Sequence, residues 1–423
     1  MGLGRELMEL DSPGEGRTRC GPRGLARMAA VWGPGLLVML ADTDAGNVVT
    51  AAQAGAQWGF RLAPLLLLLI PGLFLLQDLS LRLGLSRRAG LGRLIRERCG
   101  RAGAWLAAAA LVAATLSSLV TELSGIAGVG EMFGVSRTLT VSGAAILLMG
   151  VVLTGAYQRT ERIALLLGLF EASFFIVAWK THPSWVEAAR DAVDLPLANP
   201  RFLYLGAALI GATFNPWMVF YQSTAVVEKK LGPGDYRAAR ADTLVGAVLT
   251  QAITASILIA MAALKGGAGG SIDDIGQISG ALTPLLGDFT GRLVFGLGVV
   301  GAAMAAAIVA TLACAWGLGE LICAPSTSST ASFRRPGFLA LYSVAVVGSA
   351  ALVLGFRDLV GLSIAMQALN AVLLPGIGAL ALYVGATALR SPFAIGPVRI
   401  AVIGAILGAV SLAGLTGAAA GFF

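Results

Sequence analysis

Long runs of apolar residues dominate this chain, and they constrain its fold more than any other feature. The runs are about twenty residues long, the length that crosses the hydrocarbon core of a bilayer as an α-helix. Only 13% of the 423 residues are charged and 57% are hydrophobic, whereas a soluble domain is about one quarter charged. The sequence therefore predicts an all-α integral membrane protein.

Eleven transmembrane helices account for the apolar runs. The first and sixth predicted helices contain polar residues and Gly or Pro near their middles, and the third and eighth are long enough to tilt. The predicted helices cover residues 30–56, 61–82, 103–133, 137–157, 161–180, 200–228, 238–264, 284–323, 337–355, 359–386 and 398–421.

Lys and Arg residues concentrate in alternate loops between these helices, beginning with the N-terminal segment. Cytoplasmic loops carry such an excess, so we expect a multi-pass protein of the cell (inner) membrane with a cytoplasmic N-terminus and an extracellular C-terminus. Residues 1–28 are polar, Gly-rich and basic, without the apolar core of a signal peptide. We expect them to form a flexible cytoplasmic tail.

Several function classes lack their usual sequence signals. The chain has no GxxxxGK[ST] loop, no HExxH motif and no evident nucleophile–base set, so we expect neither ATP-driven chemistry nor an enzyme. We expect no cofactor and no nucleic-acid partner, because the positive charges lie in the loops of a membrane protein. The four cysteines form no CxxC pair, which argues against disulfides and thiolate metal sites.

Two predicted helices are interrupted at corresponding places. The first carries Asp44-Ala45-Gly46-Asn47, and the sixth, five helices later, carries Asn215-Pro216. Five is an odd offset, so the two halves of the chain would have opposite topology. Paired broken helices in inverted halves are typical of transporters whose substrate site lies near the bilayer midplane. Residues 29–423 would then form one transporter domain, with repeats at 29–180 and 200–386 and an extra helix at 398–421.

The polar groups at the two interruptions suggest a metal ion as the substrate. Asp44 offers a carboxylate, and Asn47 and Asn215 offer amide oxygens. The backbone carbonyls of Ala41 and Ala212 would face the same gap if the helices unwind there. Such an all-oxygen set suits hard divalent ions such as Mg²⁺ and Mn²⁺.

Alternative interpretations of these residues remain open. Asp44 could form a purely structural pair, although an ionisable residue inside the membrane indicates function by default. Asn215-Pro216 could be a simple kink. Asp42 lies two residues from Asp44, so on a helix it would point elsewhere, and we interpret it as a flanking polar group.

The segment 33–60, with Asp44-Ala45-Gly46-Asn47, resembles the first helix of the natural resistance-associated macrophage protein (Nramp) family of divalent metal transporters. Segments 121–134 and 211–223 resemble its third and sixth helices. The resemblance implies an inverted 5+5 repeat of the amino-acid/sodium symporter type with broken helices 1 and 6. It also implies a metal site of Asp44, Asn47, Asn215, Gln367 and the carbonyls of Ala41 and Ala212.

The departures from the family pattern concern the ion. The family has a Met at the position of Asn215 and His at the positions of Trp217 and Gln222, and it has an acidic residue at the position of Leu119. These changes resemble the Nramp-related magnesium transporters, a branch with Asn at the Met position. Glu122 matches a family position, where a proton relay or a salt bridge is the alternative; because the acidic partner position is Leu119, we expect it to be structural or to help hydrate the site. Trp217 and Gln222 are secondary site candidates.

We therefore expect uncoupled uptake of Mg²⁺ by a monomer embedded in the lipid bilayer, with Mn²⁺ as a second transported ion. The first alternative is a proton-coupled Mn²⁺/Fe²⁺ symporter of the Nramp type. Two further alternatives are a sodium-coupled organic-solute symporter of the same fold and a metal sensor that does not transport.

Overall fold

The computed structural model describes residues 33–154, 166, 173–265, 270–279, 287–322 and 336–421. These residues form helices joined by short connections, and seven of the helical stretches are long and apolar enough to cross a membrane. The predicted tail, residues 1–28, and most of the predicted fifth helix, 161–180, lie outside the described residues. The class of fold predicted from the sequence, an all-helical membrane protein, is confirmed.

The helices follow the predicted spans closely. Their bounds are α2 Pro34–Leu40, α3 Ala45–Trp58, α4 Ala63–Arg87, α5 Leu91–Met132, α6 Arg137–Thr154, α8 Ser173–Lys180, α9 Trp185–Asp191, α10 Pro200–Thr213, α11 Pro216–Glu228, α12 Tyr236–Lys265, α14 Asp288–Ile322, α16 Pro336–Gly355, α17 Leu359–Ala388 and α18 Pro397–Ala420.

One boundary differs substantially from the prediction. The third span was expected to begin at residue 103, but α5 begins at Leu91 and continues through a kink at Gly100, where φ is 68°. The segment before the kink carries several Arg residues, which the sequence analysis assigned to a loop. These residues form helix because the apolar side chains of Leu91, Leu94 and Ile95 are buried in the protein.

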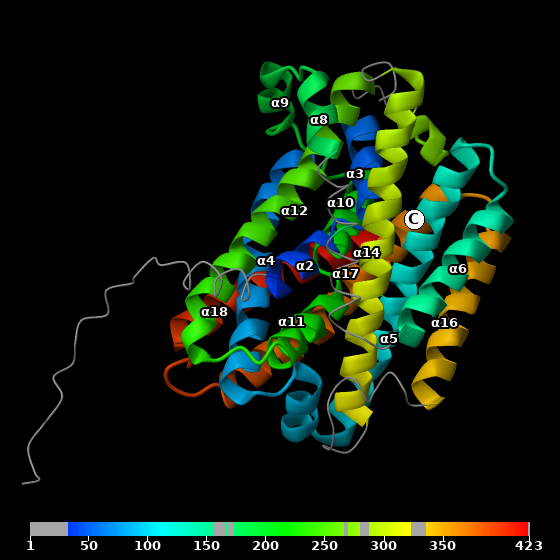
Figure 1. Cartoon of the computed structure of the whole chain (residues 1–423). Helices are drawn as coiled ribbons and strands as arrows, with labels where there is room; N and C mark the ends of the chain where they lie inside the picture. The colour runs from blue at the N-terminus through cyan, green and yellow to red at the C-terminus, as the bar shows by residue number, and fades with distance from the viewer. Residues whose placement is uncertain are drawn as a thin grey trace, which may run out of the picture.

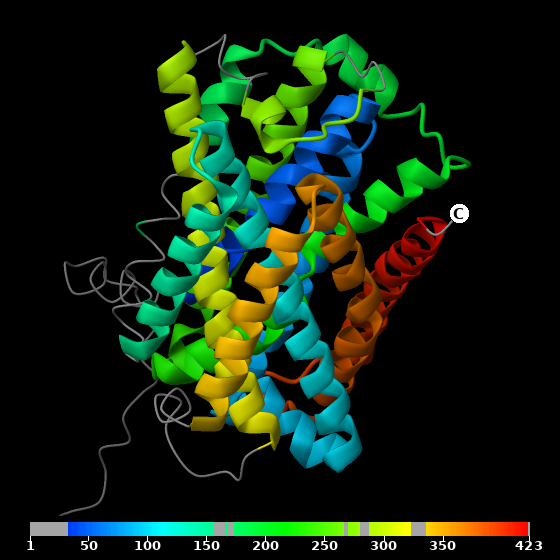
Figure 2. The ribbon, with the colours of Figure 1, turned by 90° about the vertical axis from the view of Figure 1, so that its right-hand side faces the viewer.

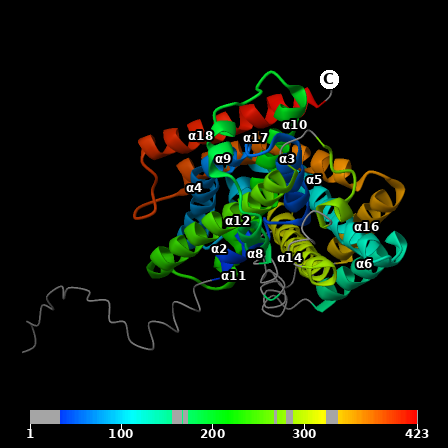
Figure 3. The same cartoon turned by 90° about the horizontal axis from the view of Figure 1, so that it is seen from above.

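The two interrupted spans lie in the middle of the bundle. Helices α2 and α3 and helices α10 and α11 are enclosed by longer helices, with α18 along one side and α6 and α16 along another (Figures 1 and 3). Helix α12 packs against α2 and α3, α14 packs against α5, and α17 packs against both α5 and α10. The polar residues of the interruptions are therefore buried on all sides by helices.

The outer helices present apolar side chains to the surroundings. Ile146 and Leu153 of α6, Val344 of α16 and Leu412 of α18 are each more than half exposed. These helices run along the periphery of the bundle (Figure 2). Apolar side chains facing outward along such helices fit contact with lipid, where the hydrocarbon chains replace a protein core.

Buried ionic contacts join helices at one end of the bundle. Asp78 of α4, 1% exposed at its side chain, accepts hydrogen bonds from Arg82 at 2.8 Å and from Arg399 of α18 at 2.6 Å. The hydroxyl of Tyr236, the first residue of α12, donates to the other carboxylate oxygen at 2.9 Å. Asp78 thus connects α4, α12 and α18.

Candidate cation site

The chain unwinds between α2 and α3 at residues 41–44. Asp44 adopts an extended conformation with φ −73° and ψ 171°, and its carboxylate accepts a hydrogen bond from the backbone N–H of Asn47 at 2.6 Å. This is the arrangement of a helix N-cap, for which Asp is among the favoured residues. Asp44 therefore begins α3 and is held at the break with its side chain fully buried.

The second interruption follows from Pro216. Proline lacks a backbone N–H and disfavours a helical conformation in the residue before it. Asn215 accordingly has φ −63° and ψ 122°, and α11 begins at Pro216. Helix α10 ends at Thr213, and the N–H of the next residue, Phe214, donates to the carbonyl of Ile210 at 2.9 Å. The alternative of a simple kink in a continuous helix is wrong, because the helix stops and restarts.

Side chains from three helical segments connect the two breaks. The Asn215 amide donates to Asp42 Oδ1 at 3.1 Å and to the carbonyl of Ala212 at 3.1 Å. From α17, Gln367 Nε2 donates to Asp44 Oδ1 at 3.0 Å. The structure thus brings Asp44, Asn215 and Gln367 together, as predicted. The Ala212 carbonyl lies at the same break, where it accepts the hydrogen bond from Asn215.

Asn47 and Ala41 lie at the same break. The Asn47 amide donates to the carbonyl of Asp42 at 3.0 Å, which directs its nitrogen inward along the unwound segment. Ala41 follows the last residue of α2 and is fully buried. Both residues lie at the α2–α3 break, and their role as ligands of a common ion stays a prediction.

Two residues that the sequence analysis did not place in the site also belong to it. Asp42 was interpreted as a flanking group, which is wrong, because the backbone around it is not helical and its carboxylate accepts from Asn215. Asn370 of α17 donates to Asn215 Oδ1 at 2.6 Å and to Gln367 Oε1 at 3.0 Å. Its position three residues after Gln367, on the same helix face, was the one available signal.

Several buried oxygens of this cluster have no hydrogen-bond donor among the described residues. They come from two carboxylates and two amides, which are oxygen donors that hard divalent cations prefer. The oxygens are Asp42 Oδ2, Asp44 Oδ2, Asn47 Oδ1 and Asn370 Oδ1. A buried oxygen without a partner is costly, and a cation with its water molecules would satisfy such atoms.

The close approach of α17 depends on two glycines. A Cβ atom on Gly46 of α3 would lie 2.3 Å from Gln367 Nε2, and one on Gly211 of α10 would lie 1.8 Å from the Gln367 carbonyl oxygen. Neither position therefore has room for a side chain. Gly46 thus allows Gln367 to reach Asp44, in addition to weakening the helix at the break.

The secondary candidates have separate roles. Glu122 of α5 is buried, and its Oε2 accepts from the backbone N–H of Ala45 at 3.0 Å, next to Asp44. Gln222 donates to Thr243 of α12 at 3.2 Å, which directs its amide toward that helix. Trp217 is fully buried in the apolar core. Among the hydrogen bonds of the described residues, Glu122 is the one of these three that bonds a residue at the α2–α3 break.

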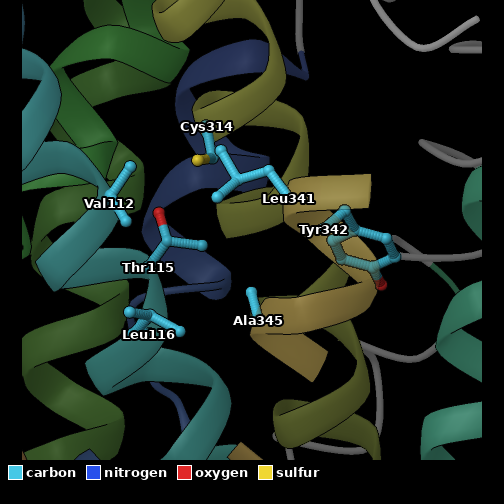
Figure 4. A pocket seen from close by; sticks show the side chains of 7 residues that line it. All are labelled: Val112, Thr115, Leu116, Cys314, Leu341, Tyr342 and Ala345. Carbon is cyan, nitrogen blue, oxygen red and sulfur yellow. The ribbon is translucent and has the colours of Figure 1, made fainter. Parts of the chain in front are cut away.

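Two pockets lie apart from these residues. The first, between α5, α14 and α16, contains none of the predicted site residues and is mainly apolar; it is lined by Val112, Thr115, Leu116, Cys314, Leu341, Tyr342 and Ala345 (Figure 4). The second is formed by the α8–α9 region and α12, and its lining includes His182. Neither has the buried carboxylates of the cation site.

Two broken helices that meet around buried carboxylates and amides are typical of membrane transporters. The family model described as natural resistance-associated macrophage protein-like matches residues 35–420. The chain therefore belongs to the Nramp family, and it is an Nramp-related divalent metal transporter, as the motifs predicted.

One sequence relative supports the same family, and one solved structure shares the fold. The chain is 31% identical over 310 residues to the divalent metal cation transporter MntH 1 of Pseudomonas aeruginosa, a match that covers 68% of this chain and 69% of the relative. A solved manganese transporter of Eremococcus coleocola superposes with a TM-score of 0.76 at 17% identity, over 93% of this chain and 87% of that one.

A more distant structural relative has a similar fold. Mhp1, a nucleobase-cation-symport-1 family transporter, matches with a TM-score of 0.54 at 15% identity, over 92% of this chain and 90% of that chain. At this identity the similarity concerns the fold alone. None of these proteins is named for magnesium, so the comparisons support a divalent metal transporter and do not support the predicted magnesium preference.

Proposed function

We propose that this protein transports the hard divalent cations Mn²⁺ and Mg²⁺ across the membrane, through the site between the two broken helices. The observation that carries the proposal is the group of buried oxygens without donors on Asp42, Asp44, Asn47 and Asn370. Mn²⁺ comes first because a structural relative is a manganese transporter. Mg²⁺ is added because the donor atoms are oxygens.

The composition of the site favours hard ions over soft ones. The hydrogen-bonded groups at the breaks are carboxylates, amides and backbone carbonyls, and Asn215 stands where the family resemblance places a Met. Thioether and thiolate sulfur favour soft ions, whereas carboxylate and carbonyl oxygens suit Mg²⁺ and Mn²⁺. Cd²⁺ and Fe²⁺ should therefore compete less well here than at a site with a Met ligand.

Alternating access would expose the site to each side of the membrane in turn. We propose inverted repeats at residues 29–180 and 200–386, with helix 398–421 in addition. The N-terminus would be cytoplasmic and the C-terminus extracellular, in the cell membrane. An inside-negative potential favours entry of a divalent ion by roughly 4.6 kcal/mol per 100 mV, which is twice the value for a single charge. Nothing in this scheme requires more than one subunit.

The test is ion flux into proteoliposomes that contain the purified protein. Mn²⁺ and Mg²⁺ should enter the vesicles and Ca²⁺ should be followed in parallel, under an imposed inside-negative potential. If the protein binds Mn²⁺ or Mg²⁺ but neither ion enters the vesicles, the result would instead support a metal sensor. A requirement for Na⁺ would support the organic-solute symporter class.

A proton-coupled Mn²⁺/Fe²⁺ symporter is the second candidate. Glu122 favours it, because this buried carboxyl group is hydrogen-bonded to Ala45, directly beside Asp44. A group in that position could release a proton when a cation enters. The comparisons also favour this candidate over uncoupled magnesium uptake, since the relatives are named for divalent metals and manganese. Acidification of the vesicle lumen during Mn²⁺ entry would support it, and Mn²⁺ entry without acidification would exclude it.

A further inference from the structure

We propose that Asp42 is a second carboxylate ligand of the transported cation, and that Asn370 is the positioning residue that orients the ligands of both breaks. This inference rests on the proposed function, because it assigns roles within the same site. It makes the site a dicarboxylate site, whereas the sequence motif supplies a single carboxylate, Asp44.

The surroundings of Asp42 point to a positively charged partner. The side chain is fully buried, and one oxygen accepts from Asn215 at 3.1 Å. The other oxygen, Oδ2, faces no hydrogen-bond donor among the described residues. No Lys or Arg of the described part of the chain forms an ion pair with Asp42 or Asp44. Buried charges are normally paired or bind a metal.

A continuous chain of hydrogen bonds connects the two carboxylates. Gln367 donates to Asp44 Oδ1, and Asn370 donates to Gln367 Oε1. The same Asn370 amide donates to Asn215 Oδ1 at 2.6 Å, and Asn215 donates to Asp42 Oδ1. Each carboxylate thus has one oxygen fixed by an amide, while its Oδ2 remains available.

Asn370 occupies the middle of this chain. Its two N–H groups serve the α11 break through Asn215 and the α17 ligand Gln367. An amide fixed in this way has one orientation, so Asn215 must direct its own nitrogen toward Asp42. Loss of the Asn370 amide would free the Asn215 and Gln367 amides to turn, so both carboxylates would lose a fixed amide donor at once, although Asp44 would keep the Asn47 N–H.

The second carboxylate has a consequence for ion selectivity. With Asp42 and Asp44 ionised and the neighbouring Glu122 carboxyl protonated, the charge of the side chains around the break is −2, which balances one divalent ion. A monovalent ion would leave one buried negative charge uncompensated, at a substantial cost. Asp42 should therefore strengthen divalent binding and exclude Na⁺ and K⁺.

The first experiment is titration of Mn²⁺ and Mg²⁺ into the purified full chain, with wild type, Asp42→Asn and Asp42→Glu compared. Asp42→Asn keeps the size and one acceptor for Asn215 but removes the charge, and we expect Mn²⁺ affinity to fall at least tenfold. Asp42→Glu restores the charge and should recover part of the loss. Wild-type affinity in Asp42→Asn would overturn the proposal.

The second experiment is a double-mutant cycle of Asp42→Asn with Asn370→Leu, read out as Mn²⁺ affinity. If Asn370 acts by orienting the carboxylates, its substitution should cost less in the Asp42→Asn background than in wild type. Asn370→Gln, which keeps the amide, should lose less affinity than Asn370→Leu. Equal effects of Asn370→Leu in both backgrounds would show a purely structural role.

A matched control is available on the same helix. Ser363 of α17 is buried and donates only to the carbonyl of Leu359 in its own helix. Ser363→Ala should bind Mn²⁺ like wild type. If wild type itself binds and transports neither Mn²⁺ nor Mg²⁺, the proposed function fails; if wild type does both and Asp42→Asn is unchanged, only the present inference fails.

Discussion

Asn215 donates a hydrogen bond to Asp42 over 3.1 Å, although 173 residues separate them in the sequence. Each residue lies where a helix is interrupted, so this contact joins the two breaks directly. It explains why both breaks are needed to form one site. The contact also places a second carboxylate beside Asp44, and the predictions below depend on this arrangement.

Substitution of Asp44 should abolish transport. Asp44→Ala removes the carboxylate that accepts a hydrogen bond from Gln367 and that caps the N-terminus of α3. Loss of an N-cap alone costs about 1 kcal/mol of stability. Asp44→Asn retains the cap and removes the charge, so it separates ion binding from folding. We expect Mn²⁺ flux below detection for both variants, with Asp44→Asn eluting as a folded protein on size exclusion.

Substitution of Asn215 by Met should change the ion preference toward soft metals, because sulfur replaces oxygen at the break. The measurement is competition of Cd²⁺ against Mn²⁺ and Mg²⁺ for uptake, where we expect a rise in Cd²⁺ inhibition of about tenfold, or roughly 1.4 kcal/mol. Gln222→Met is the matched control, since Gln222 is a buried amide of the same helix that bonds Thr243 instead. An unchanged profile for Asn215→Met would show that residue 215 does not contact the ion.

Substitution of Gly46 by Ala should impair the site without removing any ligand. The added Cβ would lie 2.3 Å from Gln367 Nε2 and 2.9 Å from Thr121, so Gln367 must move away from Asp44. We expect at least a tenfold loss of Mn²⁺ affinity. Gly143→Ala on α6 is the control, because a Cβ there meets nothing within 4 Å. Retained affinity in Gly46→Ala would contradict the close approach of α17.

Asp242 should hold α2 in place. Its Oδ2 accepts from the backbone N–H of Gly35 at 2.8 Å and of Gly33 at 3.3 Å, at the start of α2. Asp242→Ala removes this contact, and we expect the protein to lose about 1 kcal/mol of stability, the usual effect of a lost helix cap. Thermal unfolding in detergent would measure the change. Asp235→Ala, in the 3-10 helix Pro233–Asp235 before α12, is the comparison for a carboxylate outside the transmembrane helices.

The sequence was sufficient to predict both broken helices, because Asn215-Pro216 and Asp44-Ala45-Gly46-Asn47 impose local backbone constraints. The sequence predicted Gln367 as a site residue only through the family resemblance. Asp42 was missed because the helical spacing rule was applied to a segment that is not helical. Asp242, near the start of α12, bonds Gly33 and Gly35, more than 200 residues away. Contacts of that kind depend on helix packing, which local sequence does not encode.

The most direct test of the account is Mn²⁺ and Mg²⁺ flux in proteoliposomes with wild type, Asp44→Asn and Asp42→Asn, recorded together with a lumenal pH dye. We predict entry of both ions with wild type, no entry with Asp44→Asn, and at least a tenfold reduction of apparent affinity with Asp42→Asn. The dye decides between proton-coupled and uncoupled entry. Wild-type flux of either ion through Asp44→Asn would contradict the assignment of the cation site to the two helix breaks.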